Sequence, residues 1–235
     1  MLAATATAPR TGRPDDPAGN LSQFWSAEPS PAWLRSAMIP LDFGKREIIF
    51  SMGDAADGVY FLARGRVKVY RPSEDGREIT LAILDEGDIF GEEALMRPTP
   101  RTPFAEALEP TVVYHVERAD FLRGVANSPR IAMRLLEITG HRLARAHQQV
   151  EDLAFRGVTS RIANLLLDMS REHGSREGME VIVTPRLTHR QMASLVRTTR
   201  ETLTATLSKL ASLNLIRSSR RAVRIIDGEA LAALI

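Results

Sequence analysis

Residues 187–216, LTHRQMASLVRTTRETLTATLSKLASLNLI, constrain the fold of this chain more than any other stretch. They hold two short helical patterns with a tight break between them. Thr188 and Gln191 form a capping box, in which the threonine oxygen accepts a free backbone amide and the glutamine reaches back, so a helix is expected to start here. Its apolar pattern stops at Arg197, and Thr199 is the expected cap of a second helix. The stretch therefore predicts a helix-turn-helix.

The second predicted helix has one apolar and one polar face. Leu203, Leu207 and Leu210 recur at spacings of three or four residues and are expected to be buried. The polar face opens with arginine, glutamate and threonine, which suits a DNA major groove, where arginine pairs with guanine and glutamate accepts from cytosine. A helical hairpin with a solvated polar face is the alternative for this stretch taken alone. The candidate DNA-binding residues of the two helices are Thr188, Arg190, Thr199, Arg200, Glu201, Thr204, Ala205, Ser208 and Lys209.

Positive charge is concentrated in the same third of the sequence. Residues 156–235 contain 13 Lys and Arg against 7 Asp and Glu, a net charge of +6, whereas residues 1–155 contain 18 against 22, a net charge of −4. A basic segment around a candidate recognition helix is what binding to a polyanion requires. Double-stranded DNA is therefore the predicted partner.

Composition and motifs argue against several classes of function. The chain has no cysteine, which rules out disulfides, thiolate catalysis and a cysteine-ligated iron–sulfur cluster. Its five histidines are scattered, and the sequence shows no H-E-x-x-H, nucleophile–base pair or Walker-type loop, so neither a metal site nor an enzyme activity is expected. An apolar run of the ~20 residues that span a bilayer is absent, as is a secretory signal. A cytoplasmic location without a membrane partner is expected.

A β-domain is predicted between about residues 42 and 116, where short apolar or alternating runs are separated by glycine and acidic residues. Runs at this spacing point to an antiparallel β-roll or sandwich. Residues 1–30, rich in Ala, Thr, Pro and Gly, are expected to be a disordered leader, and residues 33–38 a short helix that docks on the β-domain. The expected strands are 47–50, 59–62, 67–70, 79–84 and 111–116.

One segment, residues 87–95, interrupts this alternation and is followed by Arg101 and Thr102. A short helix after Gly91 would aim free backbone amides at an anion, while the arginine adds a charge-assisted bond and the threonine a hydroxyl. Glu92 could accept hydrogen bonds from sugar hydroxyls. Ordinary turn chemistry is the alternative explanation for these residues taken alone.

A long helix is predicted from Ser128 to Phe155, opening with a serine cap and a first-turn proline. Leu136, Leu143 and Val150 recur every seven residues, and a second apolar stripe accompanies them. A helix with two apolar stripes can pack on its own domain and on a second copy of itself, so a dimerising helix is favoured over a purely intradomain one. The second stripe consists of Ile131, Leu135 and Ile138.

The chain ends in a predicted wing. Two short strands around a basic turn would lie behind the recognition helix, and Arg220 and Arg221 at the tip would touch DNA phosphates without reading sequence. A hairpin turn with two solvated arginines is the alternative. Upstream of the helix-turn-helix, the expected elements are a helix over 158–169 with Arg161 on its outside, a polar loop over 171–180 and a strand over 181–183.

The order of these parts, from about residue 40 to the C-terminus, resembles the cyclic-AMP receptor protein and FNR family of bacterial transcription regulators. The resemblance implies an α+β fold: an N-terminal antiparallel β-roll of the jelly-roll, cyclic-nucleotide-binding type, a long dimerisation helix and a C-terminal winged helix-turn-helix. Three motifs carry it: Gly87-Asp88-Ile89-Phe90-Gly91-Glu92 resembles the family's G-D-x-x-G-E, Arg101-Thr102 its phosphate-holding pair, and Thr199-Arg200-Glu201-Thr202 the S/T-R-E-T of its recognition helix.

The family resemblance also implies a function. It predicts a ligand-controlled regulator that binds a palindromic operator as a homodimer, with the recognition helices in successive major grooves, and that works with RNA polymerase. The implied ligand is a cyclic nucleotide, with cyclic AMP favoured; a regulatory module that responds to another ligand, or to none, is the alternative. The implied ligand-binding residues are Gly91, Glu92, Glu93, Arg101 and Thr102, with His147 from the long helix. The implied domains are a leader (1–30), a β-roll effector-binding domain (31–127), a dimerisation helix (128–155) and a DNA-binding domain (156–235).

The chain departs from the family at three places. Members that bind cyclic AMP usually carry Thr-Ser on the long helix, where they meet the adenine, and this chain has Ala146-His147. The second family arginine of the recognition helix, four residues after Glu201, is Ala205, which removes roughly 1–3 kcal/mol of discrimination at one base pair unless neighbouring hydroxyls compensate or the half-site differs. Arg197 occupies a turn position that is often glycine, which predicts backbone strain if φ is positive there.

Overall fold

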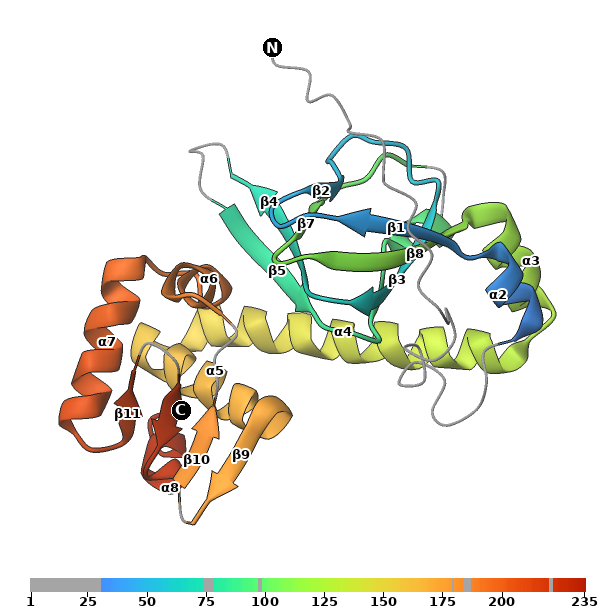
Figure 1. Cartoon of the computed structure of the whole chain (residues 1–235). Coiled ribbons are helices and arrows are strands. Elements are labelled where there is room, and N and C mark those ends of the chain that lie inside the picture. The colour runs from blue at the N-terminus through green and yellow to red at the C-terminus, as the bar shows by residue number, and fades with distance from the viewer. Residues whose placement is uncertain (1–30, 74–77, 97–98, 179, 184–186, 220–221) are drawn as a thin grey trace. The chain divides into compact units, whose positions relative to one another are not determined.

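The computed structural model describes residues 31–73, 78–96, 99–178, 180–183, 187–219 and 222–235. The chain forms two compact units, one that ends at Leu136 and one that begins at Glu137 (Figure 1). The N-terminal unit is built mainly of strands and the C-terminal unit mainly of helices with one small sheet, so the predicted α+β class is confirmed. The expected leader over residues 1–30 lies outside the described residues.

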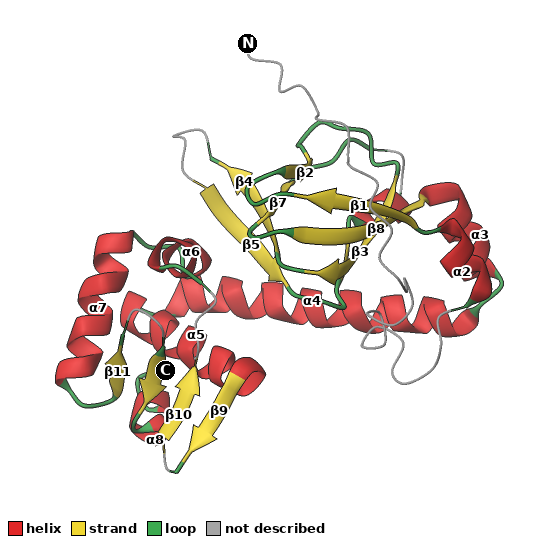
Figure 2. Ribbon diagram, in the orientation of Figure 1, coloured by secondary structure: helices red, strands yellow, loops and turns green. Residues whose placement is uncertain are grey.

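The N-terminal unit is an antiparallel β-roll. Within the described residues its strands form two four-stranded sheets, in the orders β1-β8-β3-β6 and β2-β7-β4-β5 (Figure 2). Aromatic rings from both sheets meet between them, where Tyr60 stacks on Phe90 at 5.2 Å and Phe50 lies 5.6 Å from Tyr60 between centroids. The strands are β1 (Ile39–Phe43), β2 (Ile48–Phe50), β3 (Gly58–Arg64), β4 (Val67–Pro72), β5 (Glu78–Leu84), β6 (Ile89–Phe90), β7 (Phe104–Ala107) and β8 (Thr111–Glu117).

All five strands expected from the sequence are present, and β1, β6 and β7 are additional. Strand β1 contains Pro40 and pairs only with β8, at the edge of its sheet, which is where proline is tolerated. Strand β6 has two residues, and β7 reads FAEA, whose buried members are small alanines. Short length and small side chains leave little periodic signal, which explains why the sequence pattern missed them.

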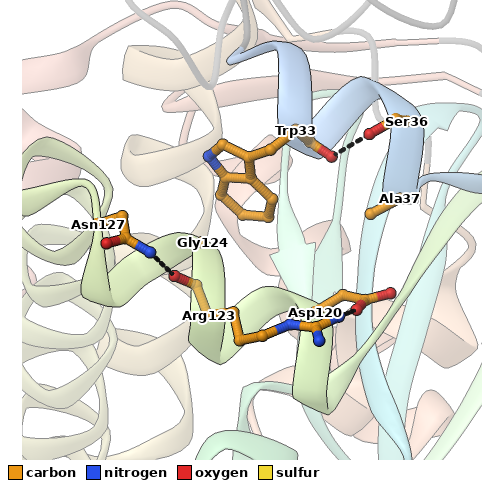
Figure 3. Close-up of a pocket in the computed structure, with 7 residues that line it drawn as sticks. All are labelled: Trp33, Ser36, Ala37, Asp120, Arg123, Gly124 and Asn127. Carbon is orange, nitrogen blue, oxygen red and sulfur yellow. Dashed lines mark hydrogen bonds and ion pairs between the residues drawn. The ribbon is translucent and has the colours of Figure 1, made fainter.

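Two helices, α2 (Ala32–Ala37) and α3 (Arg118–Ala126), lie at one end of the roll. The Trp33 ring packs edge-on against Phe121, with centroids 6.2 Å apart, and covers Gly124, where a β-carbon would overlap it. Residues of the two helices line a pocket of about 480 Å³. Figure 3 shows Trp33 among these lining residues. The short helix predicted near residues 33–38 therefore exists and docks on the β-domain, as expected.

The long helix α4 (Pro129–Phe155) confirms the helix predicted over 128–155. Of its two apolar stripes, the one with a seven-residue repeat is exposed: Leu136, Leu143 and Val150 are 63 %, 57 % and 62 % accessible. Ile131, from the other stripe, is 1 % accessible. Within one chain, the stripe with the seven-residue repeat is therefore exposed to solvent, whereas Ile131 of the other stripe is buried.

The C-terminal unit is a winged helix-turn-helix. Apolar side chains of its helices and sheet form one core that includes Ile162, Leu166, Met192, Leu203 and Val223. Its sheet has the order β11-β12-β10-β9, and β11 and β12 form the hairpin of the predicted wing. The elements are α5 (Val158–His173), β9 (Gly174–Glu177), β10 (Glu180–Val183), α6 (His189–Leu195), α7 (Arg200–Ser212), β11 (Ile216–Ser218), β12 (Val223–Ile225) and α8 (Gly228–Ala232).

Two local predictions for this unit are wrong. The polar loop expected over 171–180 is largely regular, because α5 continues to His173 and β9 starts at Gly174. All residues of β9 are exposed, and the strand is held by backbone pairing with β10, so it carries no apolar signal. Arg161, expected on the outside of its helix, is half-buried and donates hydrogen bonds to Val196 O and Arg156 O.

Candidate DNA interface and effector pocket

The first helix of the motif, α6, begins with the predicted capping box. Thr188 Oγ1 accepts from Gln191 N at 3.3 Å, and Gln191 Oε1 accepts from Thr188 N at 2.7 Å. After the helix the chain turns at Arg197, whose φ of 52° is left-handed and meets the condition under which strain was expected there. A non-glycine residue there is strained by roughly 1–2 kcal/mol. The Arg161 Nε–H bond to Val196 O, at 3.1 Å, fixes the turn from behind.

The second helix, α7, presents the polar face that the sequence predicts. Thr199 caps it by accepting from Thr202 N at 3.1 Å, while Leu203, Leu207 and Leu210 are buried. The helix start is therefore satisfied locally and its polar face is left for a ligand. The predicted DNA-binding residues of the two helices are all exposed: Thr188, Arg190, Thr199, Arg200, Glu201, Thr204, Ala205, Ser208 and Lys209.

One contact across the motif was not expected from the sequence. His189 Nδ1 lies 3.1 Å from Thr204 Oγ1 and links the first turn of α6 to the exposed face of α7. The two residues are 15 positions apart, and nothing in the local pattern marks His189. This contact places an imidazole at the edge of the candidate DNA-reading surface.

The turn of the wing hairpin is closed by hydrogen bonds from the Ser219 side chain. Ser219 Oγ donates to Ala222 O at 3.0 Å and accepts from Ala222 N at 3.1 Å. The predicted phosphate contacts Arg220 and Arg221 lie outside the described residues. Arg224, on β12, instead pairs with Glu177 and Glu180, with Nη1–Oε2 distances of 3.1 and 3.3 Å, and ties the wing to the β9–β10 hairpin.

The second candidate site lies in the β-roll, where η2 (Glu92–Leu95) is a short 3-10 helix after Gly91. Gly91 has a φ of 74° and buried surroundings, and a β-carbon there would come within 2.7 Å of Arg101 Nη1. The position therefore needs glycine both for its backbone conformation and for its space. This confirms the predicted short helix after residue 91.

Arg101 is the centre of this site and is completely buried, with 0 % of its side chain accessible. Its Nη2 donates to Gly58 O at 2.6 Å and its Nη1 to Gly91 O at 2.8 Å. The guanidinium also stacks on Phe50, with Cζ 4.5 Å from the ring centroid. Nε has no partner among the described residues. With two of its five N–H donors the arginine thus holds the η2 turn against β3.

Two carboxylates, those of Glu93 and Asp57, lie beside the guanidinium, and Asp57 also faces His115. Glu93 Oε1 lies 3.9 Å from Arg101 Nη1, and Asp57 Oδ1 lies 3.4 Å from Nη2 and 3.5 Å from His115 Nε2. The Glu93 and His115 atoms have ion-pair distances but lack a hydrogen bond within the described residues. Burial raises the pKa of Glu93 against the opposing effect of Arg101, and burial lowers the pKa of His115 against the opposing effect of Asp57.

Comparison with known proteins matches two parts of the chain to domain families. Residues 40–128 match the cyclic nucleotide-binding domain and residues 160–234 the Crp-like helix-turn-helix domain. The CRP-like cAMP-activated global transcriptional regulator of Mycobacterium tuberculosis is 34 % identical over 210 residues, which are 89 % of this chain and 94 % of that protein. The chain belongs to the cyclic-AMP receptor protein and FNR family of transcription regulators.

Other family members agree in sequence and in fold. The cyclic AMP receptor protein of Thermus thermophilus is 30 % identical over 183 residues, which are 78 % of this chain and 82 % of that protein. The solved structure of a CooA mutant from Carboxydothermus hydrogenoformans has a TM-score of 0.79 at 22 % identity and covers 91 % of this chain and 94 % of its own. The predicted family and its three-part architecture are therefore confirmed.

The residues that the family resemblance predicts to bind a ligand fall into two groups, one in the β-roll and one on α4. Gly91, Glu92, Glu93, Arg101 and Thr102 all lie in the β-roll around η2. Glu92 and Glu93 are half-buried and Thr102 is exposed. His147 lies on the part of α4 that belongs to the C-terminal unit and is exposed. Sequence reasoning missed Asp57, Tyr60 and His115, because β3 and β8 bring them to Arg101 from distant positions.

Two features of the described residues bear on other classes of function. Those residues contain no group of three or more His, Asp or Glu side chains placed to hold a metal ion. None of the helices described there is both long and apolar enough to cross a membrane.

Proposed function

We propose that this regulator binds a two-fold symmetric DNA operator as a homodimer, in the cytoplasm and together with RNA polymerase, under the control of a small anionic ligand. The observation that carries the proposal is the exposed polar face of α7, held rigidly by its Thr199 cap, its leucine stripe and the Arg161 bond to the turn. The net charge of +6 over residues 156–235 supports a polyanionic partner. A rigid, basic helix-turn-helix is suited to major-groove reading.

The exposed stripe of α4 supports the homodimer. Leu136, Leu143 and Val150 are spaced by seven residues and are each more than half exposed. Three large apolar side chains in one line along a helix are the pattern that a parallel second helix covers. A dimer formed along this stripe would give the two recognition helices the two-fold symmetry that a palindromic operator requires.

The β-roll supports a cyclic nucleotide as the ligand. Glu93 Oε1 and Arg101 Nε, two buried polar atoms without a hydrogen-bond partner among the described residues, lie beside η2 and can serve a ligand that carries both an anionic group and hydroxyls. Cyclic AMP is the favoured nucleotide, because the Mycobacterium tuberculosis relative is named as cAMP-activated. Ala146 and His147 replace the family's Thr-Ser, so recognition of the base is expected to differ.

One observation favours a second possibility, control by another ligand or by none. The Arg101 guanidinium is bonded to Gly58 O and Gly91 O and is inaccessible to solvent. A cyclic phosphate must displace at least one of these bonds to use the same donors. If the displacement is too unfavourable, the β-roll acts as a structural domain and DNA binding is independent of cyclic nucleotides.

Arg200→Ala tests the DNA-binding proposal. Loss of a bidentate guanine contact should weaken binding to a selected operator by ~1–3 kcal/mol and relax the preference at one base pair. Fluorescence anisotropy with the operator and with random DNA measures both effects. The matched control is Arg171→Ala, because Arg171 on α5 is exposed and pairs with Asp168. Equal losses on operator and random DNA for Arg200→Ala would contradict a base-reading role.

The identity of the ligand is tested on the same operator. The protein is titrated with cyclic AMP, cyclic GMP and cyclic di-GMP while operator affinity is measured. A ligand that favours the DNA-binding arrangement must raise the affinity, since it can shift the equilibrium only through a difference in its own binding. If none of the three nucleotides changes the affinity, the ligand-independent alternative is supported.

A further inference from the structure

Between the first turn of α7 and the exposed Lys209, the exposed positions 204, 205 and 208 offer no free side-chain hydrogen-bond donor. The Thr204 hydroxyl donates to Arg200 O at 2.8 Å, and the Ser208 hydroxyl donates to Thr204 O at 3.0 Å. A hydroxyl has one hydrogen, so each of these groups keeps only acceptor lone pairs for a ligand. Ala205, exposed between them, carries a single methyl group. Positions 204, 205 and 208 therefore present methyl groups and acceptors.

His189 also contacts the Thr204 hydroxyl, from a different direction than Arg200 O. Its Nδ1 lies 3.1 Å from Thr204 Oγ1. Because the threonine hydrogen already goes to Arg200 O, the histidine must donate, which requires a hydrogen on Nδ1. The hydroxyl is thus held by two partners, which leaves the γ-methyl group and one oxygen lone pair of Thr204 for a base edge.

The four base pairs differ in how well they suit such a surface. Guanine presents two acceptors in the major groove, N7 and O6, and needs donors, which positions 204, 205 and 208 lack. Thymine presents a methyl group, which alanine and threonine methyl groups contact favourably, and its partner adenine donates from N6. Methyl groups together with acceptor oxygens therefore match an A·T pair.

This inference rests on the proposed DNA-binding function and deepens it. We infer that Thr204 and Ala205 select an A·T base pair through the thymine methyl group, at the position where an arginine side chain at 205 would select guanine. Arg200 and Glu201 precede these residues by one helical turn on the same exposed face, so the pair adjoins the bases that they contact. His189 acts as a positioning residue for Thr204.

Selection of binding sites from randomised half-sites locates the base pair and tests its identity. Wild type and Ala205→Arg are selected in parallel, and the position whose preference differs between them is the one that residue 205 faces. The expected result is an A·T pair for the wild type and a G·C pair for the variant at that position. A G·C pair in the wild type, or an unchanged preference in the variant, would overturn the inference.

Replacement of the thymine by deoxyuridine removes only the methyl group. Wild-type affinity should fall about fourfold, which corresponds to ~0.8 kcal/mol for one buried methyl group at 1.4 kcal/mol per tenfold. Thr204→Ser and Thr204→Val form a matched pair: the serine variant, which keeps the hydroxyl, should lose part of the preference for thymine over deoxyuridine, and the valine variant should keep it. Equal wild-type affinity for the two operators would overturn methyl recognition.

The same experiments separate this inference from the proposed function. If the wild-type protein enriches no half-site, the DNA-reading function itself fails and the inference fails with it. If a half-site is enriched and Arg200→Ala relaxes it, but the pair facing residue 205 is insensitive to the thymine methyl group, the function stands and only the inference fails. Circular dichroism of each variant checks that α7 is folded.

Discussion

Arg101→Met replaces the buried guanidinium of the β-roll with an apolar side chain of similar length. Arg101 donates to Gly58 O at 2.6 Å and to Gly91 O at 2.8 Å, and it stacks on Phe50. The substitution leaves two buried carbonyl oxygens without these donors and removes the stacking. It therefore measures what the inward-facing arginine contributes to the fold, apart from any role toward a ligand.

The expected change in the free energy of unfolding is the balance of opposing effects. Each hydrogen bond from a charged donor contributes ~1.5–3 kcal/mol net, and a cation–π contact ~0.5–2 kcal/mol. Against this, the wild-type fold bears a desolvation cost of several kcal/mol for the buried charge, and methionine refills most of the volume. A net loss of about 2–4 kcal/mol in the free energy of unfolding of the N-terminal unit is therefore expected, near the scale of breaking a buried charged contact.

Tryptophan fluorescence provides a selective assay. Trp33 packs against Phe121 within the N-terminal unit, so its emission in a urea titration reports on the unfolding of that unit. At a typical slope of ~2 kcal/mol per molar urea, the midpoint should fall by ~1–2 M. Arg64→Met is the matched control, because Arg64 is exposed at the end of β3 and should change stability by less than ~0.5 kcal/mol.

A midpoint equal to that of the wild type would refute the reasoning, because the contacts of the guanidinium would then only offset its desolvation. A higher midpoint would refute it in the opposite direction. It would mean that Arg101 lowers the stability of the fold and is explained by a ligand alone. Measuring Arg101→Met with and without cyclic AMP separates the two roles, since only the ligand role depends on the nucleotide.

Three other outcomes depend on single groups. Gly124→Ala should destabilise the N-terminal unit by ~1–3 kcal/mol, because the new β-carbon would overlap the Trp33 ring. Gly140→Ala, whose β-carbon would meet no atom within 4 Å, should instead raise the free energy of unfolding by ~0.5–1 kcal/mol. Urea titrations that show the same sign of change for both variants would contradict this. Arg197→Gly should stabilise the C-terminal unit by about 0.5–1 kcal/mol, since it relieves a φ of 52°, and a lower thermal midpoint by circular dichroism would argue against strain there. Burial raises the pKa of Tyr60 to about 12, so the folded state keeps this proton where the unfolded chain, with a pKa of 10.0, loses it; its contribution to stability is complete below pH 10 and is lost as the pH rises toward 12. Tyrosinate absorbance of Tyr60 appearing at pH 10 in the folded protein, identified by comparison with Tyr60→Phe, would contradict that shift.

Local sequence was sufficient for the elements whose determinants lie within one or two helical turns. The Thr188 capping box, the Thr199 cap and the leucine stripe of α7 are all present as expected. Each depends on side chains three or four positions apart, which any helix brings together. At Arg197 the family resemblance pointed to a turn position that is often glycine, and the structure shows the positive φ there. Strand β9 shows the limit, because an edge strand held by backbone pairing needs no apolar pattern.

For the candidate sites, the sequence indicated which residues take part but not how their side chains contact one another in space. From the motifs alone, Gly91 and Arg101 were assigned to one candidate ligand site, and Arg200 and Glu201 to the start of a candidate DNA-reading helix. The packing of the folded chain turns Arg101 inward to Gly58 O, 43 positions away, and brings His189 to the Thr204 hydroxyl from 15 positions away. Such contacts depend on how strands and helices from distant parts of the chain pack, and no periodicity within either segment encodes the partner that the fold brings to it.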